Sequence, residues 1–142
     1  MNTADIFAHA LTAGDFSHAT TAGDSAYATT SGNYAHATTA GNYARATTSG
    51  NYAHATTAGN HAHATTAGAS ARASVSGANS IAVAVGYNSA ARAADGGFIV
   101  LAQYDGDTVV AVKTAQVGRD GIKPDTWYKL SPTGEFVEVE VE

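Results

Sequence analysis

The sequence lacks cysteine altogether and contains only two prolines and one tryptophan. The absence of cysteine excludes a disulfide framework and cysteine-based metal or redox chemistry, and it is typical of a cytosolic protein. No apolar run reaches the length of a signal peptide or a membrane-spanning helix. We therefore expect a soluble chain with no export signal and no membrane partner.

Large apolar side chains are also scarce. Leu, Ile, Val and Phe together make up 22 of the 142 residues, which is below the level usual for a globular core. The formal net charge of -5 is nevertheless too small for a disordered chain expanded by charge repulsion. We therefore expect an ordered fold that is held together without a conventional core of large side chains.

Charge is distributed unevenly along the chain. Residues 1–94 contain three carboxylates and three arginines, whereas residues 95–142 contain nine carboxylates and four basic side chains. This change predicts two parts, a neutral region over residues 1–94 and an acidic domain over residues 95–142. The first part has no basic stripe, so we expect no double-stranded nucleic acid as a partner.

A nine-residue repeat fills the first part. Ten units run from Asp5 to Ala94, and typical units read GNYAHATTA from Gly32 and GNYARATTS from Gly41. Repetition at a fixed period indicates a solenoid, in which each unit packs mainly against its neighbours. About five residues lie between the turn signals of successive units, too few for a stable isolated helix. We therefore predict one short strand and one corner per unit.

Alternation within the unit predicts which side chains face inward. The fourth and sixth positions are usually Ala, whereas the third, fifth and seventh are large or polar. We expect alanine to line a thin interior, with Tyr, His, Arg and Thr pointing outward. Gly at the first position is expected to supply the positive φ angle of the corner.

Successive units differ in a regular way that predicts the size of one turn. The fifth and ninth positions alternate between neighbouring units, which favours two units per turn over a three-unit turn of 27 residues. Ten units would then form five turns, about 24 Å of stacked strands. The predicted fold is an all-β, nonapeptide-repeat parallel β-solenoid, or β-roll.

Residues 95–142 predict a small β-domain that caps this roll. Strand candidates span residues 98–104, 108–117, 127–130 and 136–141, and turn signals with Gly, Pro or Asp separate them. This part holds 14 of the 22 Leu, Ile, Val and Phe residues and the only tryptophan. Because repeat arrays need an atypical terminal unit to cover an open sheet edge, we assign it a capping and oligomerisation role.

Two resemblances add to this interpretation. The stretch GANSIAV from Gly77, continued by GYNSA from Gly86, resembles the β-roll head repeats of trimeric autotransporter adhesins, which implies an alanine-lined roll that trimerises. The repeats followed by GGFIVLA from Gly96 and IKPDTWY from Ile122 are similar to a group of poorly characterised phage and prophage proteins. That second resemblance covers most of the chain and implies a phage origin, but it transfers no catalytic or binding residues.

Histidines and aromatic residues recur as candidate ladders. His18, His36 and His54 lie 18 residues apart, and stacked imidazoles can hold a metal ion. No carboxylate or cysteine completes such a ligand set, so we favour structural stacking and predict no metal and no cofactor. The third position carries a row of aromatic residues, which can stack on bases or, as we favour, pack between strands or protomers: Phe7, Phe16, Tyr34, Tyr43 and Tyr52.

Other binding or catalytic chemistry is weakly supported. Paired threonines resemble the hydroxyl arrays of ice-binding solenoids, but only one threonine of a pair can face outward from a strand, so ice binding is a distant third hypothesis. A calcium-binding roll needs repeated Asp in its turns, whereas here Asp15 and Asp24 give way to Asn33, Asn42, Asn51 and Asn60. No Ser-His-Asp order, phosphate loop or carboxylate pair is evident. We predict a protein that is not an enzyme and has no catalytic residues.

These observations lead to a functional hypothesis. We expect a homo-oligomeric phage accessory protein, trimeric by its adhesin-like repeats, that acts in the host cytoplasm by capturing an immune nucleotide or blocking a host defence protein. The alternative is a structural or adhesive part of the virion, such as a tail-fibre tip. Because an anionic nucleotide needs guanidinium and aromatic partners, the candidate ligand-binding residues are Arg45, Arg72, Tyr43, Tyr52, His36 and His54.

Overall fold

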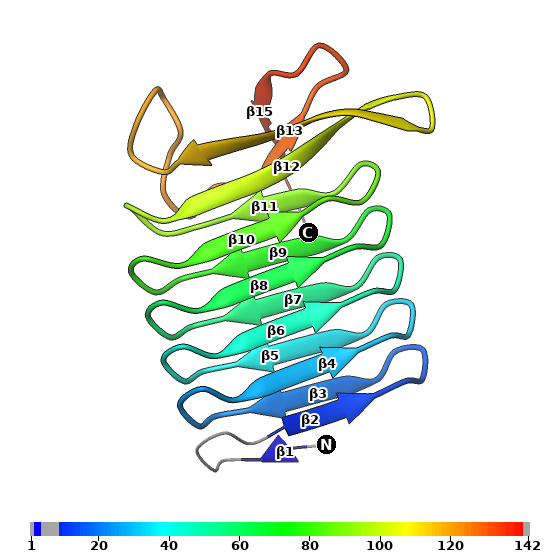
Figure 1. The fold of residues 1–142 in the computed structure, drawn as a ribbon, viewed down its shortest axis with the longest axis vertical. Coiled ribbons are helices and arrows are strands. Elements are labelled where there is room, and N and C mark those ends of the chain that lie inside the picture. Colours follow the sequence, from blue (N-terminus) through cyan, green and yellow to red (C-terminus); the bar gives the residue numbers. More distant parts are fainter. Residues whose placement is uncertain (1, 4–8, 141–142) are drawn as a thin grey trace.

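The computed structural model describes residues 2–3 and 9–140, and the regular elements in these residues are all β-strands. Figure 1 shows the strands stacked like the rungs of a ladder, with the C-terminal segment closing one end. The predicted all-β solenoid is confirmed. None of the described residues forms a helix that could span a membrane.

The strands form two sheets that face each other across a thin interior. Sheet A contains eight strands in the order β1-β3-β5-β7-β9-β11-β14-β15, and sheet B contains seven in the order β13-β12-β10-β8-β6-β4-β2. The strands of sheet A are β1 (Asn2–Thr3), β3 (His18–Thr21), β5 (His36–Thr39), β7 (His54–Thr57), β9 (Arg72–Val75), β11 (Ala90–Arg92), β14 (Tyr128–Leu130) and β15 (Phe136–Glu138). Those of sheet B are β2 (His9–Thr12), β4 (Tyr27–Thr30), β6 (Arg45–Thr48), β8 (His63–Thr66), β10 (Ile81–Ala84), β12 (Phe98–Asp105) and β13 (Thr108–Gln116).

Successive turns of the roll are 18 residues apart. In sheet A, His18 pairs with His36, and His36 pairs with His54, in parallel register. In sheet B, Tyr27 pairs with Arg45 in the same way. One turn therefore contains two nine-residue units, one in each sheet, and the alternative of a 27-residue turn is excluded.

The interior is lined by small side chains, as predicted, but alanine does not line it alone. The alanines at the fourth and sixth positions are buried, as at Ala35 and Ala37. Threonines at the eighth position are buried as well, because each strand extends its alternation by one more inward residue: Thr21, Thr30, Thr39, Thr48, Thr57 and Thr66. The Oγ1 atoms of these six threonines have no hydrogen-bond partner.

The corners correct our expectation for glycine. The positive φ angle falls on the third residue of the unit, with φ 58° at Tyr34 and at Tyr52, and not on the glycine of the first position. Glycine is required for a different reason: a Cβ atom at Gly50 would overlap the backbone carbonyl of Gly32, one turn below. Because the third residue lies in the corner and not in a strand, its side chain projects from the edge of the roll rather than from the outer face of a sheet.

The second residue of the unit connects neighbouring corners. The Asn51 N–H donates to Asn33 Oδ1 at 2.9 Å, and the Ala69 N–H donates to Asn51 Oδ1 at 2.8 Å. At the start of the same column, the Asn33 N–H donates to Asp15 Oδ1, also at 2.9 Å. An amide oxygen and a carboxylate oxygen both accept this bond, so the change from Asp to Asn along the chain preserves the corner.

The C-terminal segment extends both sheets of the roll. Strand β12 pairs in parallel with β10 and then turns back as β13 in an antiparallel hairpin, while β14 and β15 add to sheet A. All four predicted strands are present, and the last ends at Glu138. The core becomes larger here, because Ile99, Leu101 and Tyr128 join the alanines in one continuous apolar cluster.

Candidate functional site

The outer face of sheet A carries a column of stacked rings. The imidazoles of His18 and His36 lie 4.8 Å apart between ring centroids, and those of His36 and His54 lie 4.6 Å apart. Parallel register places Arg72 on the next rung after His54. The column therefore changes from aromatic to cationic as it approaches the C-terminal cap.

A second column of rings runs along the adjacent edge of the roll. Phe16, Tyr34 and Tyr52 occupy the same corner position in successive turns, and their ring centroids are 5.0 Å apart at both steps. The next two corners of this column carry Ser70 and Asn88 instead of aromatic residues. The face of the Tyr52 ring that points towards the cap is thus not covered by a further ring.

Two shallow depressions lie where this aromatic column ends, and both are lined by Tyr52, Ser70 and Arg72. One has a volume of about 230 Å³ and is completed by Asn88, Lys129, Glu140 and two alanines. The other has a volume of about 190 Å³ and includes Tyr34 and His54. We call the residues Tyr52, His54, Ser70, Arg72, Asn88 and Lys129 the Tyr52 site.

The cap contributes one positive charge to this site. Lys129 lies on β14, and its Nζ donates a hydrogen bond of 3.0 Å to Asn88 Oδ1. Asn88 Nδ2 in turn approaches Ser70 Oγ at 3.4 Å. Lys129 and Arg72 line the same depression, and Glu140 supplies its single carboxylate.

Burial lowers the pKa of two imidazoles in the histidine column, those of His36 and His54. The pKa of His54 is lowered to about 4, first by burial and then by the charges of His36 and Arg72. The pKa of His36 is lowered by burial and by His18, and burial also lowers the pKa of the Arg72 guanidinium. The positive charge of the site therefore resides on Arg72 and Lys129, while His54 acts as a neutral hydrogen-bonding ring.

The structure places four of the six predicted site residues on one side of the roll. His36, His54 and Arg72 lie on the outer face of sheet A, and Tyr52 lies at the adjacent edge. The structure separates the other two from them. Arg45 lies on β6 in sheet B, where its guanidinium is 5.5 Å from the centroid of the Tyr27 ring. Tyr43 lies at the opposite edge, stacked on His61 at 5.1 Å. The 18-residue turn causes this division, because residues nine positions apart alternate between the two sides.

Sequence reasoning did not identify Ser70, Asn88 or Lys129 as site residues. The first two had a detectable signal, since they interrupt the aromatic residues of the third position in one 18-residue column. Lys129 had none, because its hydrogen bond to Asn88 joins residues 41 positions apart through the cap. Phe7, which we placed in the aromatic row, lies outside the described residues.

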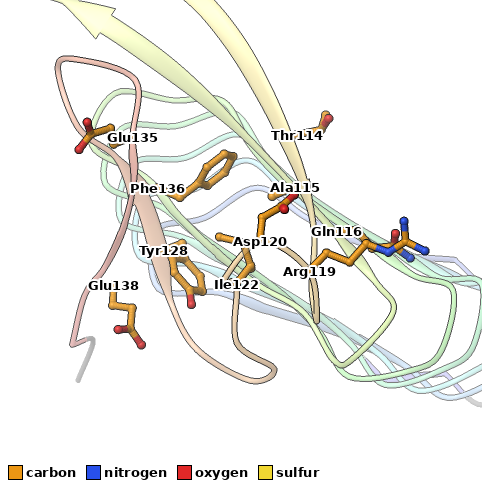
Figure 2. Close-up of a pocket in the computed structure, with 11 residues that line it drawn as sticks. Thr114, Ala115, Gln116, Arg119, Asp120, Ile122, Tyr128, Glu135, Phe136 and Glu138 are labelled. Atoms are coloured by element: carbon orange, nitrogen blue, oxygen red, sulfur yellow. The ribbon is translucent and has the colours of Figure 1, made fainter.

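A larger cavity lies elsewhere, at the capped end of the roll, and has a volume of about 510 Å³. Figure 2 shows it between the end of β13, the loop that carries Arg119 to Ile122, and the β14–β15 hairpin. Ile122, Tyr128 and Phe136 give it apolar walls, and three carboxylates and one guanidinium lie around them. We call this cavity the cap groove.

Neither location shows the geometry of a metal centre. Within residues 2–3 and 9–140, no group of three or more His, Asp or Glu side chains is placed to hold a metal ion. The histidine column therefore stands as a stack of rings followed by a cation. No protein-family model, curated protein or solved structure matches this chain.

Proposed function

We propose that this is a binding protein whose Tyr52 site holds a planar, anionic ligand of the nucleotide class. The observation that carries the proposal is the interrupted ladder: the corner column continues as rings to Tyr52 and then changes to Ser70, and a depression lies beside the change. A base stacked on Tyr52 would extend the ladder by one rung. Stacking on an aromatic side chain contributes about 1–3 kcal/mol per base.

The charges beside the ring suit a phosphate. Arg72 and Lys129 line the same depression as Tyr52, against one carboxylate, Glu140. A guanidinium can donate two parallel hydrogen bonds to a phosphate, and Lys adds a point charge. The Ser70 hydroxyl and the Asn88 amide line the same depression and could form hydrogen bonds with the polar edge of a base.

The size of the site limits how much of a ligand it encloses. Its volume of about 230 Å³ is below the roughly 300–1,000 Å³ typical of sites that bury a whole drug-sized ligand. One base with its first phosphate fits this space better than a complete dinucleotide. A larger ligand would extend over the surface or reach a second protomer of a homo-oligomer.

The biological setting follows from the phage-protein resemblance. We propose that the protein is a non-enzymatic phage accessory factor that acts in the host cytoplasm by capturing a nucleotide signal of host immunity. Direct blockade of a host defence protein is the nearest variant of this function. A structural or adhesive role in the virion is the alternative, and enrichment of the protein in purified virions would favour it.

Titration calorimetry tests the site with AMP, a cyclic dinucleotide and ADP-ribose as probes. We expect saturable binding of at least one probe, weakened at least tenfold by Arg72→Ala and by Tyr52→Ser. The matched controls are Arg45→Ala and Tyr43→Ser, which remove the same groups from the other sheet and the other edge. These control variants should bind like the parent protein.

A gain of side chain gives the sharpest test. Ser70 has φ 53°, close to the 58° of Tyr52, so the corner accepts an aromatic residue in the same backbone conformation. Ser70→Tyr should complete the ladder, fill the depression and abolish nucleotide binding without lowering the melting temperature. If Ser70→Tyr leaves nucleotide binding intact, or if Arg45→Ala weakens binding as much as Arg72→Ala does, the nucleotide does not bind at the Tyr52 site.

A further inference from the structure

The geometry points to a second binding site, at the cap. We infer that the free edge of β13 and the cap groove together take an extended segment of a partner protein that carries apolar residues flanked by Lys or Arg. The segment adds as a further strand to sheet B. This site is distinct from the Tyr52 site in residues, in charge and in the ligand it accepts.

The first observation is the edge strand itself. β13 is the last strand of sheet B, and among the described residues no strand pairs with its outer edge. It is nine residues long, contains no proline, and has Lys113 as its one charged residue. The Lys113 Nζ donates to the Gly134 carbonyl oxygen at 2.9 Å and so does not guard the edge.

Proteins usually protect such edges with charge, proline, short strands or bulges. β13 instead exposes the residues Val110 and Val112, which are 53% and 57% accessible. The bulge at the Gln103/Tyr104 step affects the hairpin tip and leaves the stretch from Ala111 to Gln116 in regular register. A strand with this composition is suited to pair with another extended segment through main-chain hydrogen bonds.

The second observation is the position of the cap groove. Thr114, Ala115 and Gln116 at the end of β13 form one wall, and Tyr128 and Phe136 form the opposite wall (Figure 2). Alternate side chains of a strand point to the same face of a sheet. An added strand would therefore direct every second side chain towards this groove, whose volume of about 510 Å³ accommodates large apolar residues.

The third observation is the charge around the groove, which identifies the partner's chemistry. Asp120, Glu135 and Glu138 line it against a single cation, Arg119. Lys123 reaches Glu138 at 3.2 Å, but both side chains are at least half exposed, and such surface pairs contribute little. A basic segment complements this rim, whereas a second copy of a chain with net charge -5 would bring like charge towards it.

Fluorescence anisotropy with three labelled nonapeptides tests the site on the full-length protein. The first peptide alternates Lys with Val or Leu, the second has Glu in place of every Lys, and the third has Ser in place of every apolar residue. We expect saturable binding of the first peptide and at least tenfold weaker binding of the other two. Equal binding of the first and third peptides would show that only the positive charge of the peptide matters, and would overturn the proposal.

Variants and hydrogen exchange locate the binding. Asp120→Asn with Glu135→Gln should weaken the first peptide at least tenfold, whereas Asp105→Asn with Asp107→Asn, at the tip of the β12–β13 hairpin, makes the same change in net charge and should not. Backbone amides of β13 should gain protection from exchange when the peptide binds. Absence of that protection would exclude strand addition.

Sedimentation distinguishes a second copy of the chain from a foreign segment. If the protein forms a dimer that the Asp120→Asn, Glu135→Gln variant dissociates, the groove is a self-association surface and the proposal is wrong. We expect the oligomeric state to be the same in this variant and in the parent protein. Nucleotide binding at the Tyr52 site should also be unchanged.

Discussion

The repeat roll and the cap both bury an interior between two sheets, but the roll fills it with small side chains and the cap fills it with large ones. In the roll, alanines and threonines recur at fixed positions, and each turn has nearly the same cross-section as the next. In the cap, Ile99, Leu101 and Tyr128 fill a wider space with irregular shapes. Larger side chains should therefore destabilise the roll, whereas smaller side chains should destabilise the cap.

The difference also explains where the cavities are. Identical side chains stacked on successive rungs leave columns without gaps, so a regular roll offers flat faces. The depressions appear where the repetition stops: at Ser70 and Asn88 in the corner column, and at the end of the roll beside β13. Interruptions of a repeat are thus the positions to search for binding sites in a protein of this kind.

The largest expected effect is truncation in the cap. Leu101 is 1% exposed and belongs to the continuous core cluster, so Leu101→Ala should lower the free energy of unfolding by about 2–5 kcal/mol. Chemical denaturation would measure the change. A loss below about 1 kcal/mol would show that the cap contributes little to stability, contrary to the comparison drawn above.

A single methyl group at a corner should have a nearly comparable effect in the roll. Gly50→Ala places a Cβ against the Gly32 carbonyl, backbone against backbone, and we expect a loss of about 3 kcal/mol. Gly14 is the matched control, because a Cβ there meets nothing within 4 Å. Gly14→Ala should change stability by less than about 0.5 kcal/mol.

Enlargement of the thin interior should follow in size. Ala46 is fully buried between the sheets, and Ala46→Leu should overpack it at a cost of about 1–3 kcal/mol. His36→Ser, on the outer face, should cost less than this. Thermal melting of both variants would decide the matter, and equal tolerance of the two changes would reverse the assignment of inner and outer positions.

Removing a buried hydroxyl should stabilise the roll. Thr57 Oγ1 is buried without a partner, and the residue that pairs with Thr57 on the next rung is Val75, also buried. Thr57→Val repeats this natural replacement and should raise the free energy of unfolding by about 1 kcal/mol. A decrease would indicate that the hydroxyl has a partner in solution, such as a water molecule.

The smallest expected effect is a dependence on pH. The pKa of His54 is about 4 in the folded protein against an ordinary value of 6.5. Below about pH 6.5 the unfolded chain therefore binds a proton that the folded chain does not, and stability falls as the pH decreases towards 4. Because the side chain is partly exposed, solvent screens its charge and keeps the change modest.

The measurement is a comparison of melting temperatures for the parent protein and His54→Gln between pH 7 and 4. The two proteins should differ in slope, with the parent losing more stability. Parallel curves would mean that His54 titrates normally, and the fall would then belong to other groups such as the carboxylates of the cap.

The sequence alone was sufficient for the architecture. A period of nine, small residues at alternate positions and a second period of 18 are local properties of the chain, and they predicted the strands, the two-unit turn and the inward alanines. The strands of the cap were predictable for the same reason, since each is an apolar run with turn residues at its ends. Our assignment of a positive φ to glycine was wrong because the need for glycine arises from contact with a different turn.

The tertiary structure decided which side chains meet. Parallel stacking divided the aromatic row into two edges, brought Tyr52, His54 and Arg72 together, and left Arg45 and Tyr43 on other sides of the roll. Lys129 reached the same site only because β14 continues sheet A, and the cap groove exists only because two sheets end at one place. A repeat encodes its own stacking in each unit, whereas contacts between distant residues depend on how many turns separate them and how the last turn is closed.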